Sequence, residues 1–132
     1  MNKKIVGYKE KVTIGIKGNM FEVSATMDTG NGGVVPTLSV NTLIFGKPYL
    51  RFNFEGQEFT LEYKGESSTI VGGKLQKRPI VILDYIIIDG QKISEPKFAL
   101  SEKRKSDTNI LLNRDTINKF NLLMDSSLEF TI

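Results

Sequence analysis

The sequence predicts an all-β protein, a small barrel or closed sandwich with one short helix near its C-terminus. Three observations support this fold class. Apolar and polar residues alternate with period two over much of the chain, short Gly-containing segments separate the alternating runs, and apolar residues at helical spacing occur in one short segment. A series of hairpins followed by a single helix is typical of small closed β structures.

The first strands are expected to form two hairpins. Residues 11–16 (KVTIGI) and 21–27 (FEVSATM) alternate, and a short Lys-Gly-Asn connection joins them. Residues 49–54 and 58–63 alternate in the same way on either side of Glu-Gly-Gln. Each connection is short enough to make its two strands antiparallel neighbours.

A third hairpin is expected further along the chain. The β-branched run of residues 79–88 ends at Asp89-Gly90, which is a strong signal for a two-residue turn, and residues 92–100 form the return strand. Residues 122–132 supply the last strand. Residues 64–77 have the composition of a flexible connection.

The single helix is predicted within residues 113–120, after the apolar run of residues 110–112. Asp115 is the expected N-cap, and Ile117 and Phe120 lie three residues apart, so they fall on one side of the helix.

Length and composition limit the possible functions. The 132 residues are enough for one domain, residues 1–132, and 39% of them are hydrophobic. The chain has no cysteine and no histidine, so a Ser-His or Cys-His nucleophile pair is impossible and the two commonest zinc ligands are missing. We expect no metal and no cofactor. Absence of cysteine favours a reducing compartment, and we expect a cytoplasmic protein.

The charge pattern bears on possible partners. The net charge is +3, but acidic residues are interleaved with the lysines, so a nucleic-acid-binding face is not expected. A small barrel that binds nucleic acid stays open as an alternative, which salt-dependent binding to oligonucleotides would support. No apolar run approaches the length of a membrane span, and we expect no membrane partner.

One short stretch suggests chemistry. An apolar strand ends at Met27 and is followed at once by Asp28, Thr29, Gly30 and Asn31. Asp and Gly are ordinary turn residues, so this stretch is a plain turn on one interpretation. On the other interpretation, Asp28 is a catalytic carboxylate on a tight loop.

Three pieces of sequence decide between these interpretations. They are Asp28-Thr29-Gly30 after a strand, residues 77–82 (KRPIVI) entering a long strand, and residues 109–125 (NILLNRDTINKFNLLMD). In this order and spacing, over about residues 10–130, the sequence resembles retropepsin-like aspartic proteases. More narrowly, it resembles the small bacterial and viral proteins of that fold historically labelled ATP-dependent zinc proteases. Without His or Cys, any zinc would rest on carboxylates alone, and no GxxxxGK[ST] phosphate-binding loop is present.

The resemblance implies an acid-protease closed barrel and an aspartic endopeptidase. Such an enzyme activates water between two carboxylates that share one proton. This chain has a single Asp-Thr-Gly, so a homodimer is implied, in which Asp28 of each copy meets on a two-fold axis and the substrate is a peptide or protein. By match, Thr29 bonds to the partner's loop and Gly30 leaves room for that approach.

Other residues take roles from the same resemblance. The flap hairpin that covers substrate would lie within residues 66–76, with Val71, Gly72 and Gly73 near its tip. Arg114 and Asp115 match a structural Arg-Asp pair beside the active loop, with Arg114 expected to be buried. Arg78 matches a charged position of the narrower family, without an assigned role.

The chain departs from the family pattern at two positions. The family usually has Gly where this chain has Asn113, and Asn tolerates the positive φ that such a Gly supplies. Asn31 replaces the small residue that usually follows Asp-Thr-Gly. These departures motivate the alternative of a catalytically inactive module of the same fold, used for binding or assembly.

Overall fold

The structure, a computed structural model, describes residues 3–29, 35–102 and 108–132, without the side chains of residues 69 and 71. The described residues are mostly β, as predicted, with 67% in strands and one short helix. The strands and the helix are β1 (Lys4–Ile16), β2 (Asn19–Met27), β3 (Thr37–Val40), β4 (Thr42–Ile44), β5 (Tyr49–Phe54), β6 (Gln57–Glu62), β7 (Glu66–Val71), β8 (Lys74–Ile82), β9 (Tyr85–Ile88), β10 (Gln91–Ser94), β11 (Lys97–Glu102), β12 (Ile110–Leu112), α1 (Arg114–Lys119) and β13 (Leu122–Glu129).

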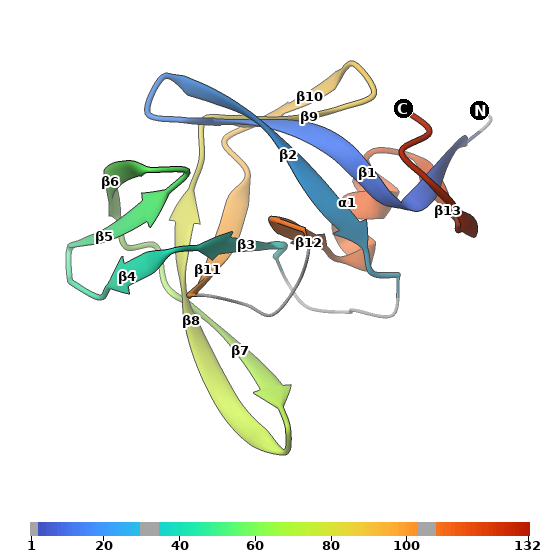
Figure 1. The fold of residues 1–132 in the computed structure, drawn as a ribbon. Coiled ribbons are helices and arrows are strands. Elements are labelled where there is room, and N and C mark those ends of the chain that lie inside the picture. Colours follow the sequence, from blue (N-terminus) through green and yellow to red (C-terminus); the bar gives the residue numbers. More distant parts are fainter. Residues whose placement is uncertain (1–2, 30–34, 103–107) are drawn as a thin grey trace.

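Ten strands form one strongly curled sheet (Figure 1). Its order is β10-β9-β1-β2-β12-β3-β11-β8-β7, and β13 pairs in parallel with β1. In the described part of the chain, β7 and β10 are the two ends of this order and do not pair with each other. The sheet therefore stays open, and the expected closure into a barrel is not seen in its hydrogen bonding.

A second sheet, β4-β5-β6, is held to the first by an aromatic cluster. Alternation along β5 buries Leu50, Phe52 and Phe54, as the period-two pattern predicted. The ring of Phe21, from β2, meets the ring of Phe54 edge-on with centroids 5.1 Å apart. Because such edge-to-face pairs add to simple area burial, this cluster fixes how the small sheet sits on the large one.

Four hairpins use two-residue turns in which both central residues have positive φ. The turns are Lys17-Gly18, Glu55-Gly56, Gly72-Gly73 and Asp89-Gly90. Positive φ at both positions defines the turn type whose twist matches that of paired strands, and it favours glycine. The three hairpins predicted from the alternating pattern are confirmed, and the Gly72-Gly73 turn belongs to the hairpin that the resemblance implied within residues 66–76.

Two predicted strands are each divided in two. Residues 79–88 split between β8 and β9 at Leu83 and Asp84, because β8 pairs with β11 whereas β9 pairs with β1. Asp84 anchors the chain where it passes from β8 to β9, since its carboxylate accepts a hydrogen bond of 2.8 Å from the Gly18 N–H in the turn between β1 and β2. The return strand over residues 92–100 divides in the same way, between β10 and β11, at Glu95 and Pro96.

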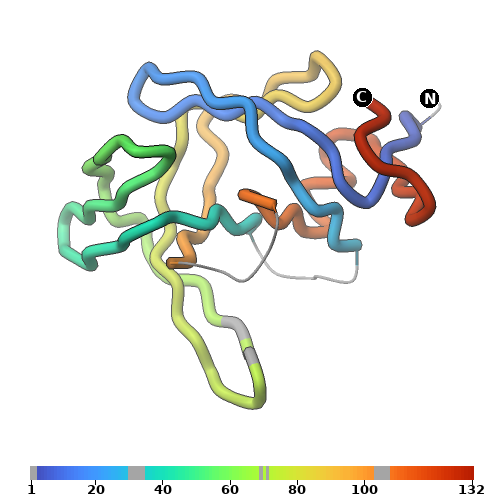
Figure 2. Tube along the Cα trace, viewed as in Figure 1, coloured from blue at the N-terminus to red at the C-terminus, as the bar shows by residue number. Residues whose placement is uncertain are grey.

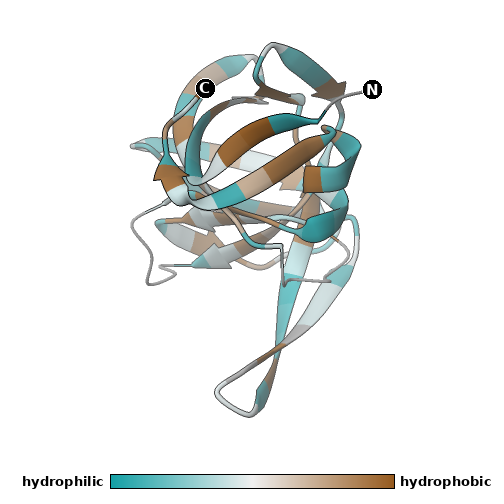
Figure 3. Ribbon diagram, turned by 90° about the vertical axis from the view of Figure 1, so that its right-hand side faces the viewer, coloured by the Kyte–Doolittle hydropathy of each residue, from teal (hydrophilic) through white to brown (hydrophobic). Residues whose placement is uncertain are grey.

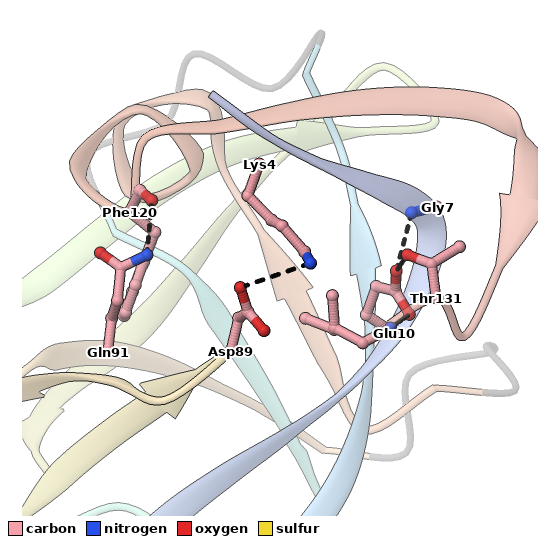
Figure 4. A network of polar contacts seen from close by, with 8 residues as sticks. Lys4, Gly7, Glu10, Asp89, Gln91, Phe120 and Thr131 are labelled. Carbon is pink, nitrogen blue, oxygen red and sulfur yellow. Dashed lines mark hydrogen bonds and ion pairs between the residues drawn. The ribbon is translucent and has the colours of Figure 1, made fainter. Parts of the chain in front are cut away.

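A buried carboxylate ties the C-terminal segment to β1 (Figure 4). Glu10 is fully buried, and it accepts hydrogen bonds from the Gly7 N–H at 2.8 Å and from the Thr131 hydroxyl. The Ile132 N–H approaches its other oxygen at 3.4 Å. No cation pairs with Glu10 in the described residues, so these donors satisfy its buried carboxyl oxygens.

Candidate active site

Asp28 lies directly beyond the end of β2, beside the short strand β12. The two strands pair in parallel, with Met27 opposite Leu112. The Asp28 N–H continues this ladder by donating a hydrogen bond of 3.0 Å to the Leu112 carbonyl oxygen. The side chain of Asp28 is half-buried and that of Thr29 is exposed, while Gly30 and Asn31 lie outside the described residues.

The other edge of β12 holds the segment that returns from the Asp28 loop. Leu111 of β12 lies opposite Thr26 of β2 and also opposite Thr37 of β3. The loop therefore leaves and rejoins the sheet on the two sides of one three-residue strand. Thr26 reinforces the junction, since its hydroxyl lies 2.7 Å from the hydroxyl oxygen of Thr108.

Asn113 follows β12 and caps α1. It is fully buried, and its backbone is extended with φ −87° and ψ 169°. Its Oδ1 accepts a hydrogen bond of 3.3 Å from the Thr116 N–H and one of 2.6 Å from the Thr116 hydroxyl. The expectation that Asn113 takes a positive φ is therefore wrong. The prediction of Asp115 as the N-cap is wrong as well, since Asp115 lies in the first turn.

Arg114 and Asp115 lie in the first turn of α1 with exposed side chains. The expectation of a buried Arg114 is therefore wrong in the single chain. In the described residues, neither side chain forms an ion pair. Asn113, which precedes them, follows Leu112, whose carbonyl oxygen accepts the hydrogen bond from the Asp28 N–H.

The expected flap segment forms a hairpin that projects from the body (Figures 1 and 2). β7 pairs with Lys74–Pro79 of β8, and only the following residues, Ile80 to Ile82, pair with β11. Its tip is the Gly72-Gly73 turn, as predicted, and nothing lies within 4 Å of the positions where their side chains would begin. Most of the hairpin is polar, as the colouring in Figure 3 shows. The exposed exceptions are Ile70 and Leu75, which face each other across it.

One solved structure shows to which family the chain belongs. It is the protein Lpg0085 from Legionella pneumophila subsp. pneumophila str. Philadelphia 1, described as a protein of unknown function (DUF785). The two chains are 31% identical, the match covers 97% of each, and the TM-score is 0.70. The chain belongs to the DUF785 family. No family profile and no curated protein matches it.

In this DUF785 protein, Arg78 connects the hairpin to the strands around Asp28. Arg78 is half-buried at the base of the hairpin, and its Nη1 donates a hydrogen bond of 3.4 Å to the hydroxyl oxygen of Thr37 on β3. Burial lowers the pKa of the Arg78 guanidinium. No described carboxylate pairs with it. Thr37 lies opposite Leu111 of β12. Arg78 is therefore linked through Thr37 to β12, the strand whose Leu112 carbonyl oxygen accepts the hydrogen bond from the Asp28 N–H.

Sequence reasoning did not find one further feature of this DUF785 member. A cavity of about 430 Å³ lies between β10 and its following turn on one side and α1 on the other. Its apolar lining includes Ile86, Ile93 and Phe98, which the sequence identified only as strand residues. No pattern could have revealed it, because four separate segments of the chain form its walls.

The described residues offer neither a cluster of metal ligands nor a membrane-spanning helix. They contain no group of three or more Asp, Glu, His or Cys side chains placed to hold a metal ion. Their helix is neither long nor apolar enough to cross a membrane.

Proposed function

We propose that this protein is a retropepsin-like aspartic endopeptidase that acts as a homodimer, with Asp28 of the two copies forming the catalytic pair. The observation that carries the proposal is the place of Asp28. It stands half-buried at the end of β2, and the parallel strand β12, which leads into α1, holds its backbone. The two most informative pieces of the sequence resemblance therefore meet at one point in the fold.

The state of the Asp28 carboxylate supports a dimer. In the part of the chain that the structure describes, this carboxylate has neither a hydrogen bond nor an ion pair. One carboxylate can remove a proton from water but cannot at the same time protonate the substrate carbonyl. A second Asp28, from another copy, would supply that proton, because two adjacent carboxylates hold one proton between them.

Such a pair would catalyse the addition of water to the peptide carbonyl, followed by elimination of the amine. The ionised carboxylate takes a proton from water as the water oxygen bonds to the peptide carbonyl carbon, and the protonated carboxyl donates its proton to the carbonyl oxygen. The carboxyl that took the proton from water then gives it to the amide nitrogen, while the other carboxylate takes a hydroxyl proton from the tetrahedral intermediate. The carbon–nitrogen bond breaks, an acid and an amine are released, and the pair again holds one proton. In this scheme Thr29 and Gly30 support the contact between the two loops.

The projecting hairpin suits the role of a substrate cover. Its outer part pairs only with itself, and the glycine turn leaves its tip unobstructed. A lid that is attached only at its base can close over an extended peptide and reopen. We assign this role to the hairpin, with Val71, Gly72 and Gly73 at the tip. We also propose a cytoplasmic location, on the basis of the cysteine-free sequence.

Cleavage and mass measurements together test the proposal. A library of peptides is incubated with the wild type and with Asp28→Asn between about pH 4 and 7, and both proteins are sedimented at the assay concentration. We expect dimers in both cases and cleavage only by the wild type. Dimers that cleave nothing would favour the inactive binding or assembly module, whereas cleavage that survives in Asp28→Asn would reject the mechanism.

A further inference from the structure

We propose that the cavity between β10 and α1 is a docking site for an extended peptide segment, which adds as a strand to the free edge of β10. This site is separate from Asp28 and does not depend on catalysis. The peptide would insert one apolar side chain into the cavity and place charged residues of both signs on either side of it. Three features support this assignment: a free strand edge, an apolar floor and a charged rim.

The strand edge follows from the register of the β9–β10 hairpin. The two-residue turn makes Ile88 and Gln91 a hydrogen-bonded pair, so Ile93 and Ile86 form the next such pair. The Glu95 N–H continues the alternation by donating a hydrogen bond of 3.0 Å to the Asp84 carbonyl oxygen. The backbone groups of Lys92 and Ser94 therefore point away from β9.

These outward groups are available for pairing. β10 is an end of the large sheet, and no described backbone group bonds to Lys92 or Ser94 on the outer side. Two residues with free N–H and C=O groups, spaced two apart, are the template that strand-adding peptides use.

The cavity beside this edge can accept an apolar side chain. Its volume of about 430 Å³ is that of a small-ligand site, and Ile86, Ile93 and Phe98 line it. Val35 and Pro36 complete the apolar lining from the segment that leads into β3. The far wall is α1, and Figure 4 shows that Gln91 at the start of β10 donates a hydrogen bond of 3.3 Å to the Phe120 carbonyl oxygen just after the helix.

The rim sets the charge of the occupant. Glu95 lies on the turn after β10, Lys97 begins β11, and Asp115 and Lys119 lie on α1. All four side chains are exposed, and none forms an ion pair within the described ranges. A peptide whose apolar residue is flanked by both acidic and basic residues can therefore pair with both walls.

The arrangement, with an edge strand on one side and a helix on the other, is that of grooves that bind peptides by strand addition. In such grooves, backbone hydrogen bonds provide affinity and the pocket selects the side chain. The cavity walls also include Val35 and Pro36, which lie between Asp28 and β3 in the sequence, and three residues of α1. Asp28 does not line the cavity, so a peptide bound there would leave the Asp28 carboxylate accessible.

An array of capped heptapeptides tests the proposal. Each peptide carries Leu, Ile, Val, Phe or Met at its centre, with Lys, Glu and Thr in all arrangements on the flanks, and each is compared with a version that has Asp at the centre. We expect a subset to bind, with an affinity about tenfold higher than that of the Asp versions. Methylation of the central peptide nitrogen should cause a similar loss, because it removes a strand hydrogen bond. If no peptide binds better than its Asp version, the proposal is overturned.

Protein variants locate the binding. Ser94→Pro removes the outward N–H of β10 without removing a bond to β9, and Ser94→Ala keeps that N–H. We expect Ser94→Pro to lower the affinity about tenfold and Ser94→Ala to leave it within about twofold. If Ser94→Pro fails to fold, the methylated peptides still test strand addition.

Chemical shifts of the labelled protein separate this site from the proposed active site. Shifts on peptide binding should centre on Ile93, Ser94 and Lys119. Shifts confined to Asp28 and the β7–β8 hairpin would overturn the docking site while leaving the proposed protease intact. Conversely, docking at β10 in a protein without cleavage activity would support this site alone.

Discussion

The Thr116 hydroxyl donates a hydrogen bond of 2.6 Å to Oδ1 of Asn113, and the Thr116 N–H approaches the same oxygen at 3.3 Å. Asn113 is fully buried between β12, which holds the Asp28 backbone, and α1. One side chain thus connects the strand beside the candidate catalytic residue to the only helix among the described residues.

This contact predicts the effect of replacing Asn113. Asn113→Gly restores the residue usual in the resembled family, yet it should destabilise this protein by about 1 kcal/mol, because it removes both hydrogen bonds and φ −87° needs no glycine. Asn113→Ala should cost about 1–2 kcal/mol. Urea unfolding measures both, with exposed Asn118→Ala on the same helix as control. A glycine variant more stable than the wild type would show that positive φ is preferred here.

The projecting hairpin predicts a local effect for Gly73→Ala. Its φ of +79° disfavours a side chain by about 1 kcal/mol, but the outer hairpin pairs only with itself. We therefore expect faster amide exchange in β7 and the outer half of β8, with little change in the global free energy of unfolding.

Gly56→Ala is the matched control for this prediction. Gly56 has φ +78° in the same turn type, between two strands that bury Phe52 and Phe59. Its replacement should lower the global free energy of unfolding by about 1 kcal/mol. Equal global losses for the two variants would contradict a hairpin that opens independently.

Replacing the carboxylate of Glu10 by an amide should lower the stability of the fold. Glu10→Gln should lower the free energy of unfolding by about 1.5–3 kcal/mol, because bonds from Gly7 and Thr131 to a buried carboxylate are charge-assisted. Amide exchange at Phe130, whose N–H donates to the Lys9 carbonyl oxygen, should accelerate. The control is Glu22→Gln, on the exposed face of β2. If both variants unfold at the same urea concentration, Glu10 does not stabilise this end of the chain.

Replacing Arg78 should have the opposite effect on the free energy of unfolding. A half-buried guanidinium with one long hydrogen bond and no described carboxylate partner pays a desolvation cost. Arg78→Met should therefore keep the free energy of unfolding unchanged or raise it by up to about 1 kcal/mol, while lowering peptide cleavage. The control is Arg51→Met, an exposed arginine 3.8 Å from Glu58. A loss above about 2 kcal/mol would show that Arg78 is needed for the fold.

The sequence was most informative where structure is local. Alternation located β5 correctly at Tyr49–Phe54, and Asp89-Gly90 located its turn, because both depend on neighbouring residues. It could not show that residues 79–88 divide at Leu83 and Asp84, since that break occurs where the chain moves from β11 to β1. The short strand β3 was missed for the same reason, as its pairing partners β11 and β12 are distant in sequence. The strand β4 pairs with the next strand, β5, and has only three residues, too few to show an alternating pattern.

The candidate site was predicted in part. The motif located Asp28 at a strand end, but the hydrogen bond to Leu112 depends on a parallel pairing that no local pattern specifies. Asp115 has the same capping chemistry as Asn113, so composition alone could not choose between them. The series of hairpins and the resemblance both favoured a closed structure, whereas closure depends on whether the end strands β7 and β10 meet.

Mixing wild type with Asp28→Asn tests the central claim most directly. The two proteins are combined at a fixed total concentration, allowed to exchange subunits, and assayed for peptide cleavage. If catalysis needs two Asp28 carboxylates, activity follows the square of the wild-type fraction, so an equal mixture retains about a quarter of the activity. Activity that falls in proportion, to about a half, would show that each chain works alone and would contradict the account.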